Sequence, residues 1–176
     1  VQINFTFKCN LRCKMCSIVN LLPQAEELST KQVFHIIDEA KDYGIKEVLL
    51  TGGEPFLRED IFEICEYIHQ VNLRSIITTN ATLIDNAIAQ KISNSKINHI
   101  HISLDGLEET NDFFRGNGAF KKIVNSINIL NQARSNNHFF SVGIACTVMD
   151  NNINDLYSIV KLADDLNIDV INFQPL

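Results

Sequence analysis

The sequence contains few of the residues that break regular structure, with three prolines and seven glycines among 176 residues. This scarcity excludes collagen-like and low-complexity chains. No apolar stretch approaches the roughly 20 residues that a membrane-spanning helix needs, and the N-terminus lacks the charged, apolar and small-residue succession of a signal peptide. These absences predict a globular protein with no membrane partner and a cytoplasmic location.

Positive charge is also in short supply, since 15 Lys and Arg stand against 21 Asp and Glu, for a net charge of -6. We therefore expect no nucleic-acid partner, and predict a small molecule or a peptide as the partner instead. The chain is long enough to bury a core without disulfides or metals. Residues 1–176 lack an initiator Met and start and stop inside apolar segments, so we expect one domain of a longer protein.

Short β-rich segments alternate along the chain with longer segments of helical period. The β-rich segments are residues 3–7, 47–51, 75–79, 99–104, 140–148 and 169–173. Alternation of this kind predicts an α/β fold with a parallel sheet. Because crossovers are right-handed and these strands are too few for the closed eight-stranded form, we predict a partial open (β/α)6 barrel with parallel strands.

The expected helices carry capping signals at their N-terminal ends. The candidate caps are Ser29 and Asp60, with capping-box partners at Gln32 and Glu63, and also Asp85 and Asn154. Apolar residues follow at helical spacing, as in Val33, Ile37 and Ala40. Gly44 suits a left-handed cap at the end of the same helix. We expect the apolar helix faces to cover the sheet.

The fourth β-rich segment, residues 99–104, alternates strictly between polar and apolar side chains. Since helices must cover its apolar side, the polar side with His99, His101 and Ser103 should face the interior of the barrel. An open barrel leaves such an interior incompletely packed. Of the five histidines, His101 is the one expected to contact a substrate there.

Three of the five cysteines fall within residues 9–16, in the spacing Cys9-x-x-x-Cys13-x-x-Cys16. They follow the first expected strand, in a loop where three sulfurs can converge on one iron–sulfur cluster. Three thiolates would leave one iron of a 4Fe-4S cluster open to another ligand. Arg12 and Lys14 add positive charge that would favour the thiolate form.

A zinc site is the alternative use of these cysteines, but it would want a fourth Cys or His nearby. The next candidate, His35, falls inside an expected helix. Cys65 lies in an expected helix at core spacing, and Cys146 lies in an apolar strand. Buried free cysteines behave as small hydrophobic residues, so we assign these two to packing.

Two motifs together resemble the radical S-adenosylmethionine superfamily: the cysteine spacing and the segment Thr51-Gly52-Gly53-Glu54-Pro55. Further segments resemble its subgroup of peptide maturases and cofactor-biosynthesis enzymes: Thr78-Thr79-Asn80, Ser103-Leu104-Asp105-Gly106 and Arg115-Gly116. The resemblance covers essentially the whole chain. Two positions depart from the family pattern, because Met15 stands where an aromatic residue is frequent and Ala81 where a glycine is frequent.

The resemblance implies roles for groups at the carboxyl ends of the strands, where parallel α/β folds bind ligands. Gly52 and Gly53 would let the backbone approach S-adenosylmethionine and adopt positive φ, and Glu54 would accept from its ammonium group. Ser103 and Arg115 suit its carboxylate. The remaining contacts would be Thr78, Asn80 and Asp105 to ribose or amino-acid groups, and Met15, Val148, Phe173 and Gln174 to adenine.

The implied function is reductive cleavage of S-adenosylmethionine at a 4Fe-4S cluster fed by an external electron donor. The resulting 5'-deoxyadenosyl radical would abstract hydrogen from a peptide or small-molecule substrate. The alternative from another class is a non-catalytic iron–sulfur or zinc module for electron transfer or assembly. Residues 52–55 favour the enzyme, because a protein that only carries electrons needs no site for the amino-acid part of S-adenosylmethionine. The sequence leaves the identity of the substrate open.

Overall fold

The computed structural model describes residues 1–18, 26–134 and 140–176, which form one sheet in the order β1-β2-β3-β4-β5-β6. Every neighbouring pair of strands is parallel. The strands are β1 (Gln2–Thr6), β2 (Glu47–Gly52), β3 (Arg74–Thr79), β4 (His99–Ser103), β5 (Ser141–Val148) and β6 (Val170–Pro175). The predicted α/β fold with parallel strands in an open sheet is confirmed.

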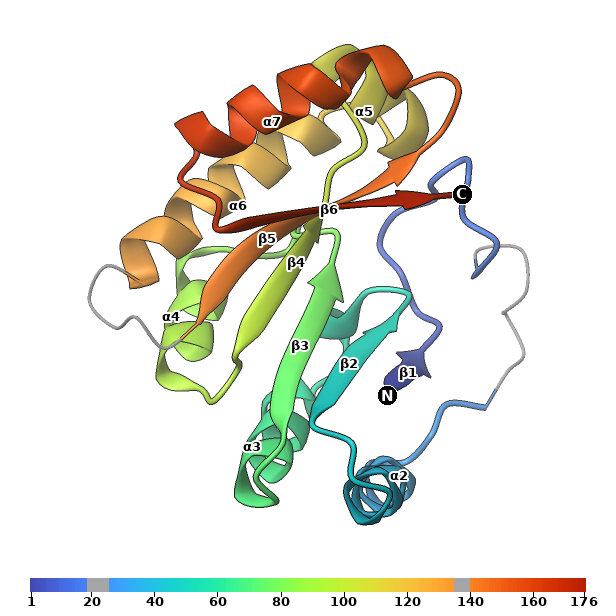
Figure 1. Cartoon of the computed structure of the whole chain (residues 1–176), viewed down its shortest axis with the longest axis vertical. Helices are drawn as coiled ribbons and strands as arrows, with labels where there is room; N and C mark the ends of the chain where they lie inside the picture. The colour runs from blue at the N-terminus through green and yellow to red at the C-terminus, as the bar shows by residue number, and fades with distance from the viewer. Residues whose placement is uncertain (19–25, 135–139) are drawn as a thin grey trace.

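Helices connect the strands and line the outside of the sheet (Figure 1). They are α2 (Thr30–Asp42), α3 (Ile61–Gln70), α4 (Asn86–Asn94), α5 (Glu108–Arg115), α6 (Ala119–Arg134) and α7 (Leu156–Asp165), with short 3-10 helices η1 (Pro55–Leu57) and η2 (Ile153–Asp155). In the described part of the chain, no helix has both the length and the apolar character needed to cross a membrane.

The hydrophobic core lies between the sheet and these helices. Ile100 and Ile102 on β4 are fully buried, and so are Val33 and Ile37 on α2. Both pairs belong to the predicted apolar faces. His101, which alternates with the two isoleucines on β4, is only partly buried. The polar face of this strand therefore turns away from the helices, as its alternation predicts.

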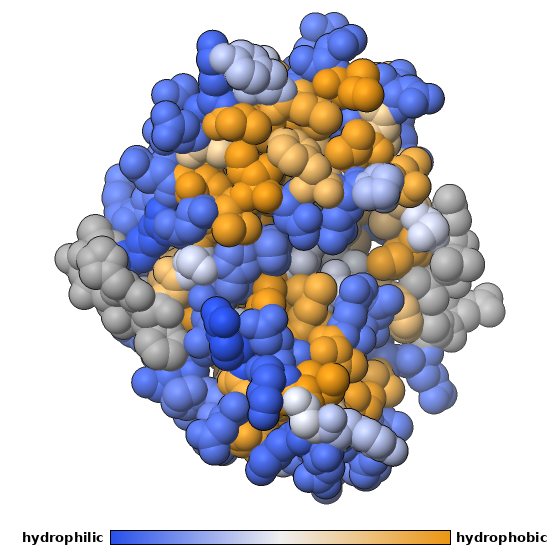
Figure 2. Space-filling model, in the orientation of Figure 1, coloured by the Kyte–Doolittle hydropathy of each residue, from blue (hydrophilic) through white to orange (hydrophobic). Residues whose placement is uncertain are grey.

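Apolar side chains also reach the surface on α7 and β6. Figure 2 shows apolar side chains gathered over the upper part of the molecule, where Figure 1 places α7 and β6 in the same orientation. Exposed members are Val160, Val170 and Phe173. β6 is an edge of the sheet, with β5 as its neighbour. Exposure of Phe173 follows from this edge position.

The predicted helix ends are confirmed at three positions. Ser29 begins α2 with a full capping box, in which its hydroxyl accepts from the backbone N–H of Gln32 and its own N–H donates to the Gln32 side chain. Asp85 begins α4 by accepting from the N–H of Ile88 at 2.8 Å. Gly44 follows α2 with φ at +78°, in the left-handed region.

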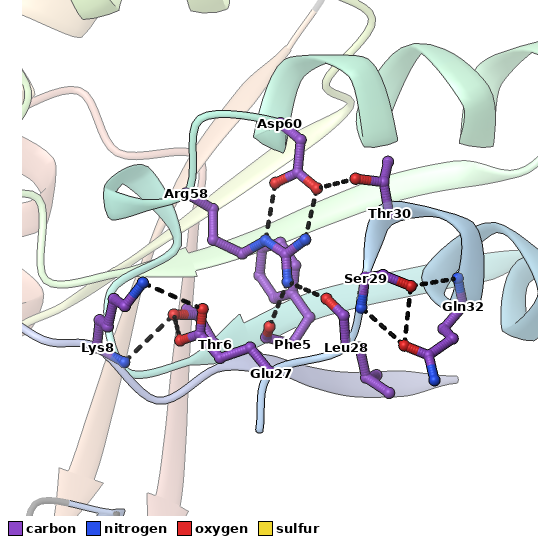
Figure 3. Close-up of polar contacts among 10 residues, drawn as sticks. All are labelled: Phe5, Thr6, Lys8, Glu27, Leu28, Ser29, Thr30, Gln32, Arg58 and Asp60. Atoms are coloured by element: carbon purple, nitrogen blue, oxygen red, sulfur yellow. Dashed lines mark hydrogen bonds and ion pairs between the residues drawn. The ribbon is translucent and has the colours of Figure 1, made fainter. Parts of the chain in front are cut away.

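Asp60 stands at the N-cap position of α3, as predicted, but its side chain makes no capping hydrogen bond. Asn154 does not cap a helix, so that prediction is wrong. Asn154 lies within η2, and α7 begins at Leu156. The Asp60 carboxylate instead accepts two bonds from Arg58, at 2.8 and 2.5 Å, and one from the Thr30 hydroxyl at 2.7 Å (Figure 3). Hydrogen bonding from Arg58 lowers the pKa of Asp60.

Arg58 also joins the first strand to the segment before α2. Its Nη1 donates to the carbonyl oxygens of Phe5 at 2.7 Å and Leu28 at 2.8 Å (Figure 3). Glu27, from the same segment, accepts from the Thr6 hydroxyl at 2.7 Å. These contacts fix the end of β1, from which the cysteine-bearing loop departs.

Two glycines keep β1 and β2 together beyond their ladder. The N–H of Gly53 donates to Thr6 at 2.8 Å, and the N–H of Glu54 donates to Lys8 at 2.7 Å. A Cβ on Gly52 would lie 2.1 Å from the Thr6 oxygen, and one on Gly53 would lie 2.1 Å from the Lys8 oxygen. The lack of side chains at Gly52 and Gly53 therefore makes room for the backbone of Thr6 and Lys8. Positive φ is confirmed for Gly52, at +134°, and is wrong for Gly53.

Replacing Arg58 with Ala should lower the free energy of unfolding by about 2–4 kcal/mol, because it removes two of the three donors to the partly buried Asp60 carboxylate and a donor that two carbonyl groups share. Urea unfolding followed by circular dichroism measures the change. Arg74→Ala is the matched control, since Arg74 pairs with Glu47 but is 61% exposed and should contribute at most about 1 kcal/mol. Equal losses in the two variants would contradict the role given to Arg58.

Replacing Gly53 with Ala should cost about 3 kcal/mol or more, since the new Cβ cannot coexist with the Lys8 carbonyl and the end of β1 must move. Thermal and urea unfolding report the loss. Gly44→Ala is the control: it also places a methyl group on a tight turn, but into open space, so only the left-handed backbone penalty of about 1–2 kcal/mol applies. A Gly53→Ala protein as stable as Gly44→Ala would disprove the close approach.

Candidate functional site

The loops after β1 to β5 and the end of α5 border one cavity of about 270 Å³, here called the cysteine cavity. It lies at the carboxyl ends of the strands, as the parallel topology predicts. The predicted site residues that line it are Cys9, Cys13, Met15, Cys16, Gly52, Gly53, Thr78, Asn80, Ser103 and Arg115. Glu54 and Asp105 were also predicted to contact the cofactor, but they lie behind its wall.

The cysteine loop is held in place by backbone contacts. Cys9, Cys13 and Cys16 are free thiols, and each is partly buried. The N–H of Leu11 donates to the Sγ of Cys9 at 3.4 Å. The N–H of Lys14 donates to the carbonyl of Phe114 at 2.8 Å, which ties the loop to α5. The three sulfurs thus sit on a loop whose position is set by distant parts of the chain.

Arg115 supplies the positive charge that acts on Cys13. Burial raises the pKa of Cys13, and the Arg115 charge opposes that rise. The predicted help from Arg12 and Lys14 is not seen in this geometry. Arg12 donates to a carbonyl of its own loop at 2.9 Å, and the Lys14 ammonium lies 3.3 Å from the ring centre of Phe113. Neither is among the charges that lower the pKa of Cys9 or Cys13.

Glu54 is fully buried beneath the turn after β3. One carboxylate oxygen accepts from the Thr79 hydroxyl at 2.7 Å and from the N–H of Phe56 at 3.1 Å, and the other accepts from the N–H of Asn80 at 2.8 Å. Burial raises its pKa, and these hydrogen bonds oppose the rise. Its carboxylate therefore positions the turn after β3 instead of facing the cavity.

Asp105 is fully buried and holds Arg115 against the cavity wall. The Nε of Arg115 donates to one Asp105 oxygen at 2.7 Å, and its Nη2 forms an ion pair with the same oxygen at 2.6 Å; the other oxygen accepts from the N–H of Thr147 at 2.9 Å. These bonds use both oxygens of the carboxylate. The geometry makes Asp105 a positioning residue for Arg115, whose third nitrogen, Nη1, makes no contact with Asp105.

Asn152 is a buried residue of the site that sequence reasoning missed. Its amide donates to the carbonyls of Asp105 at 2.8 Å and Thr147 at 2.7 Å, and its oxygen accepts from the N–H of Met149 at 2.8 Å. It thereby joins the loops after β4 and β5. In the sequence it stands among polar turn residues, and nothing distinguishes it from its neighbours. Thr51, Thr79 and Thr147 also line the cysteine cavity without having been predicted.

A second cavity, of about 490 Å³, adjoins the first, and Met15 borders both. Val148 lines it together with the rings of Phe113 and Phe114. These residues give it an apolar wall of the kind predicted for adenine. Phe173 and Gln174, which were predicted to complete that site, are exposed and line neither cavity.

The other cysteines and His101 lie apart from the cysteine cavity. Cys65 is fully buried and Cys146 nearly so, and burial raises the pKa of each to about 12, as packing residues should behave. His101 lies beside Thr78 in the sheet register and packs edge-on against His99. Within residues 1–18, 26–134 and 140–176, no three His, Cys, Asp or Glu side chains form a group that could hold a single metal ion.

The cysteine cavity has the donors that an iron–sulfur cluster with an additional ligand needs. Its lining includes three free thiols, the ligand type that holds such clusters. The walls around them present backbone of Gly52 and Gly53, the hydroxyl of Ser103 and the guanidinium of Arg115. This set offers acceptors and donors suited to an amino acid lying beside the cluster.

Curated relatives match nearly the whole chain. Fe-coproporphyrin III synthase of Methanosarcina barkeri is 33% identical over 172 residues, which are 97% of this chain and 42% of that protein. Mycofactocin maturase MftC of Mycolicibacterium smegmatis is 34% identical over 161 residues, 90% of this chain and 40% of that protein. The chain thus spans about two fifths of the length of these relatives.

Solved structures share the fold. Streptococcus suis SuiB bound to S-adenosylmethionine matches with a TM-score of 0.83 at 22% identity, over 99% of this chain and 40% of that chain. Native anSMEcpe with bound AdoMet matches with a TM-score of 0.79 at 20% identity, over 99% of this chain and 50% of that chain. Residues 3–163 match the family model described as Radical SAM superfamily, and the chain therefore belongs to the radical S-adenosylmethionine superfamily, which uses a 4Fe-4S cluster and S-adenosylmethionine.

Proposed function

We propose that this chain forms the core of an enzyme that binds a 4Fe-4S cluster through Cys9, Cys13 and Cys16 and reductively cleaves S-adenosylmethionine. The observation that carries the proposal is the shared cavity of the three thiols and Arg115 at the carboxyl ends of the strands. Membership of the superfamily and the cofactor bound in the SuiB and anSMEcpe structures support it.

When bound, the cluster supplies the electron that splits S-adenosylmethionine into methionine and a 5'-deoxyadenosyl radical, which abstracts hydrogen from the substrate. The contribution of the chain is binding and orientation. Three cysteine ligands would leave one iron of the cluster without a protein ligand, and this iron would be the position at which the amino and carboxylate groups of the cofactor bind. The partly buried loop holds that position at the floor of a cavity instead of in open solvent.

Arg115 and Ser103 are the proposed donors to the cofactor carboxylate. Both line the cysteine cavity. Because Asp105 already holds Nε and Nη2, the guanidinium loses little rotational freedom when Nη1 binds a ligand. For the ammonium group, the acceptors are backbone carbonyls of the Thr51-Gly52-Gly53 segment, which borders the same cavity. Glu54 supports that segment from behind and makes no direct contact.

The adenosine is assigned to the boundary between the two cavities. Met15 borders both, and its flexible thioether suits the face of an adenine ring. Val148 adds apolar surface from the second cavity, and Thr78 lies in the wall of the first as a candidate for the ribose hydroxyls.

The proposed substrate is a peptide or a small molecule. An external electron donor is proposed to supply the electron for the cleavage of S-adenosylmethionine. Relatives bear names of both kinds, since mycofactocin maturase stands beside Fe-coproporphyrin III synthase. A SuiB structure bound to its precursor peptide SuiA shares the fold, with a TM-score of 0.79. The present chain spans about two fifths of these proteins, so the substrate contacts of the whole protein are not assigned to it.

Anaerobic reconstitution should load the chain with a cluster, and Ala at Cys9, Cys13 or Cys16 should abolish it because each thiol is a ligand. Cys65→Ala and Cys146→Ala should retain the cluster, with only a loss of stability from the cavities they create. Iron content and visible absorption measure loading. Chromatography of reactions with a strong reductant measures 5'-deoxyadenosine, which only the cluster-bearing proteins should release.

Stoichiometric zinc without uptake of iron and sulfide would contradict this assignment. A loaded wild type that neither binds nor cleaves S-adenosylmethionine would instead favour the electron-transfer module.

Removing the Arg115 guanidinium should weaken S-adenosylmethionine binding by about 1.5–3 kcal/mol, the usual contribution of a charge-assisted bond. Because Arg115→Ala alone would leave the buried Asp105 carboxylate without its positively charged partner, the test compares Asp105→Asn/Arg115→Met with Asp105→Asn. Equilibrium binding to the cluster-loaded proteins gives the difference. Equal affinities for the cofactor in the two proteins, at equal iron content, would show that Arg115 does not contribute to cofactor binding.

A further inference from the structure

The turn after β3 reaches the cysteine loop through one side-chain amide. Asn80 is 7% exposed, and its Nδ2 lies 2.9 Å from the Oδ1 of Asn10 and 3.9 Å from the Sγ of Cys9. An amide nitrogen carries two hydrogens, so it serves both acceptors. Sulfur accepts over a longer distance than oxygen because its valence shell is larger. Asn80 is therefore in hydrogen-bonding contact with a predicted cluster ligand.

A closed ring of hydrogen bonds fixes the orientation of this amide. The Oδ1 of Asn80 accepts from the N–H of Thr82 at 2.9 Å and from its hydroxyl at 2.7 Å. The Thr82 hydroxyl in turn accepts from the Nδ2 of Asn10 at 2.8 Å. A backbone N–H can only donate, so the Asn80 edge that faces Thr82 must be the oxygen. The N–H edge must then face Cys9.

The backbone that carries Asn80 is also fixed. Its N–H donates to the buried Glu54 carboxylate at 2.8 Å. Ala81, which follows, is fully buried with φ at +59°, and its carbonyl accepts from the Ser126 hydroxyl at 2.8 Å. Neighbouring elements thus hold the turn on both sides, and the amide has little freedom to leave Cys9.

We propose that Asn80 is a second hydrogen-bond donor to the Cys9 thiolate, beside the N–H of Leu11, and that it raises the reduction potential of the cluster bound there. The inference rests on the proposed function. A reduced cluster carries one more negative charge, part of which lies on the ligand sulfurs, so donors to those sulfurs stabilise the reduced state. Asn80 thereby acts on the cluster through Cys9, and its direct contact with ribose or amino-acid groups is not required.

The test is the midpoint potential of the reconstituted wild type and of Asn80→Ala, measured by redox titration followed by electron paramagnetic resonance without S-adenosylmethionine. The potential of Asn80→Ala should be more negative at equal iron content, because one donor to Cys9 is lost. Asn94→Ala is the matched control. Asn94 is exposed on α4, and among the residues that the structure describes its side chain bonds within that helix, where it accepts from Gln90 at 3.3 Å, so its removal should leave the potential unchanged.

Asn80→Asp keeps the inference testable if the Ala variant fails to fold. It retains an oxygen for Thr82, loses the donor to Cys9 and adds a negative charge, so its potential should also become more negative. An unchanged potential in either loaded variant would overturn the proposal. Loss of the cluster from both variants would overturn it too, since Asn80 is given a tuning role only. A wild type that takes up no iron would contradict the proposed function itself.

Discussion

Close backbone contact between the loop after β1 and the Gly52-Gly53 segment is the constraint on which the rest of the site depends. It requires two residues without a Cβ, since a methyl group on Gly52 would overlap the carbonyl oxygen of Thr6 at the end of β1, and one on Gly53 would overlap that of Lys8 in the loop. Through this contact Glu54 comes to lie under the turn after β3, where its carboxylate receives Thr79 and the backbone of Asn80. Three loops are thus joined by contacts within the polypeptide.

The distribution of charge follows from the same arrangement. Both acidic side chains of the motifs, Glu54 and Asp105, are fully buried behind the wall of the cysteine cavity. A buried carboxylate is costly unless it is hydrogen-bonded or paired with a charge. Glu54 accepts three hydrogen bonds, and Asp105 accepts two and forms an ion pair with Arg115. The wall itself presents Arg115 and neutral polar groups. An anionic cluster and the carboxylate of the cofactor would therefore face the positive charge of Arg115 and, among the described lining residues, no Asp or Glu side chain.

Sequence reasoning recovered the elements and their order because strand alternation, helical spacing and turn residues agree with one another along this chain. It also placed the motifs at the correct end of the sheet. It failed where a side chain had two possible directions. Asp60 bonds Arg58 instead of the helix end, Glu54 and Asp105 point behind the cavity, and Phe173 turns outward from an edge strand. Spacing along a chain gives the location of a motif residue, and only packing gives the direction of its side chain.

The strand order has a consequence for synthesis. Because each strand lies beside its predecessor in the sequence, every new strand and helix can dock onto a completed neighbour as it leaves the ribosome. The cysteine loop is an exception: it is made before β2, yet its Lys14 bonds to Phe114, from a helix made after β4. Until α5 is made, the three thiols therefore lie on a loop that lacks this bond, although Lys8 and Asn10 can already bond to Glu54 and Asn80. Their final arrangement is a late event, set by the arrival of α5.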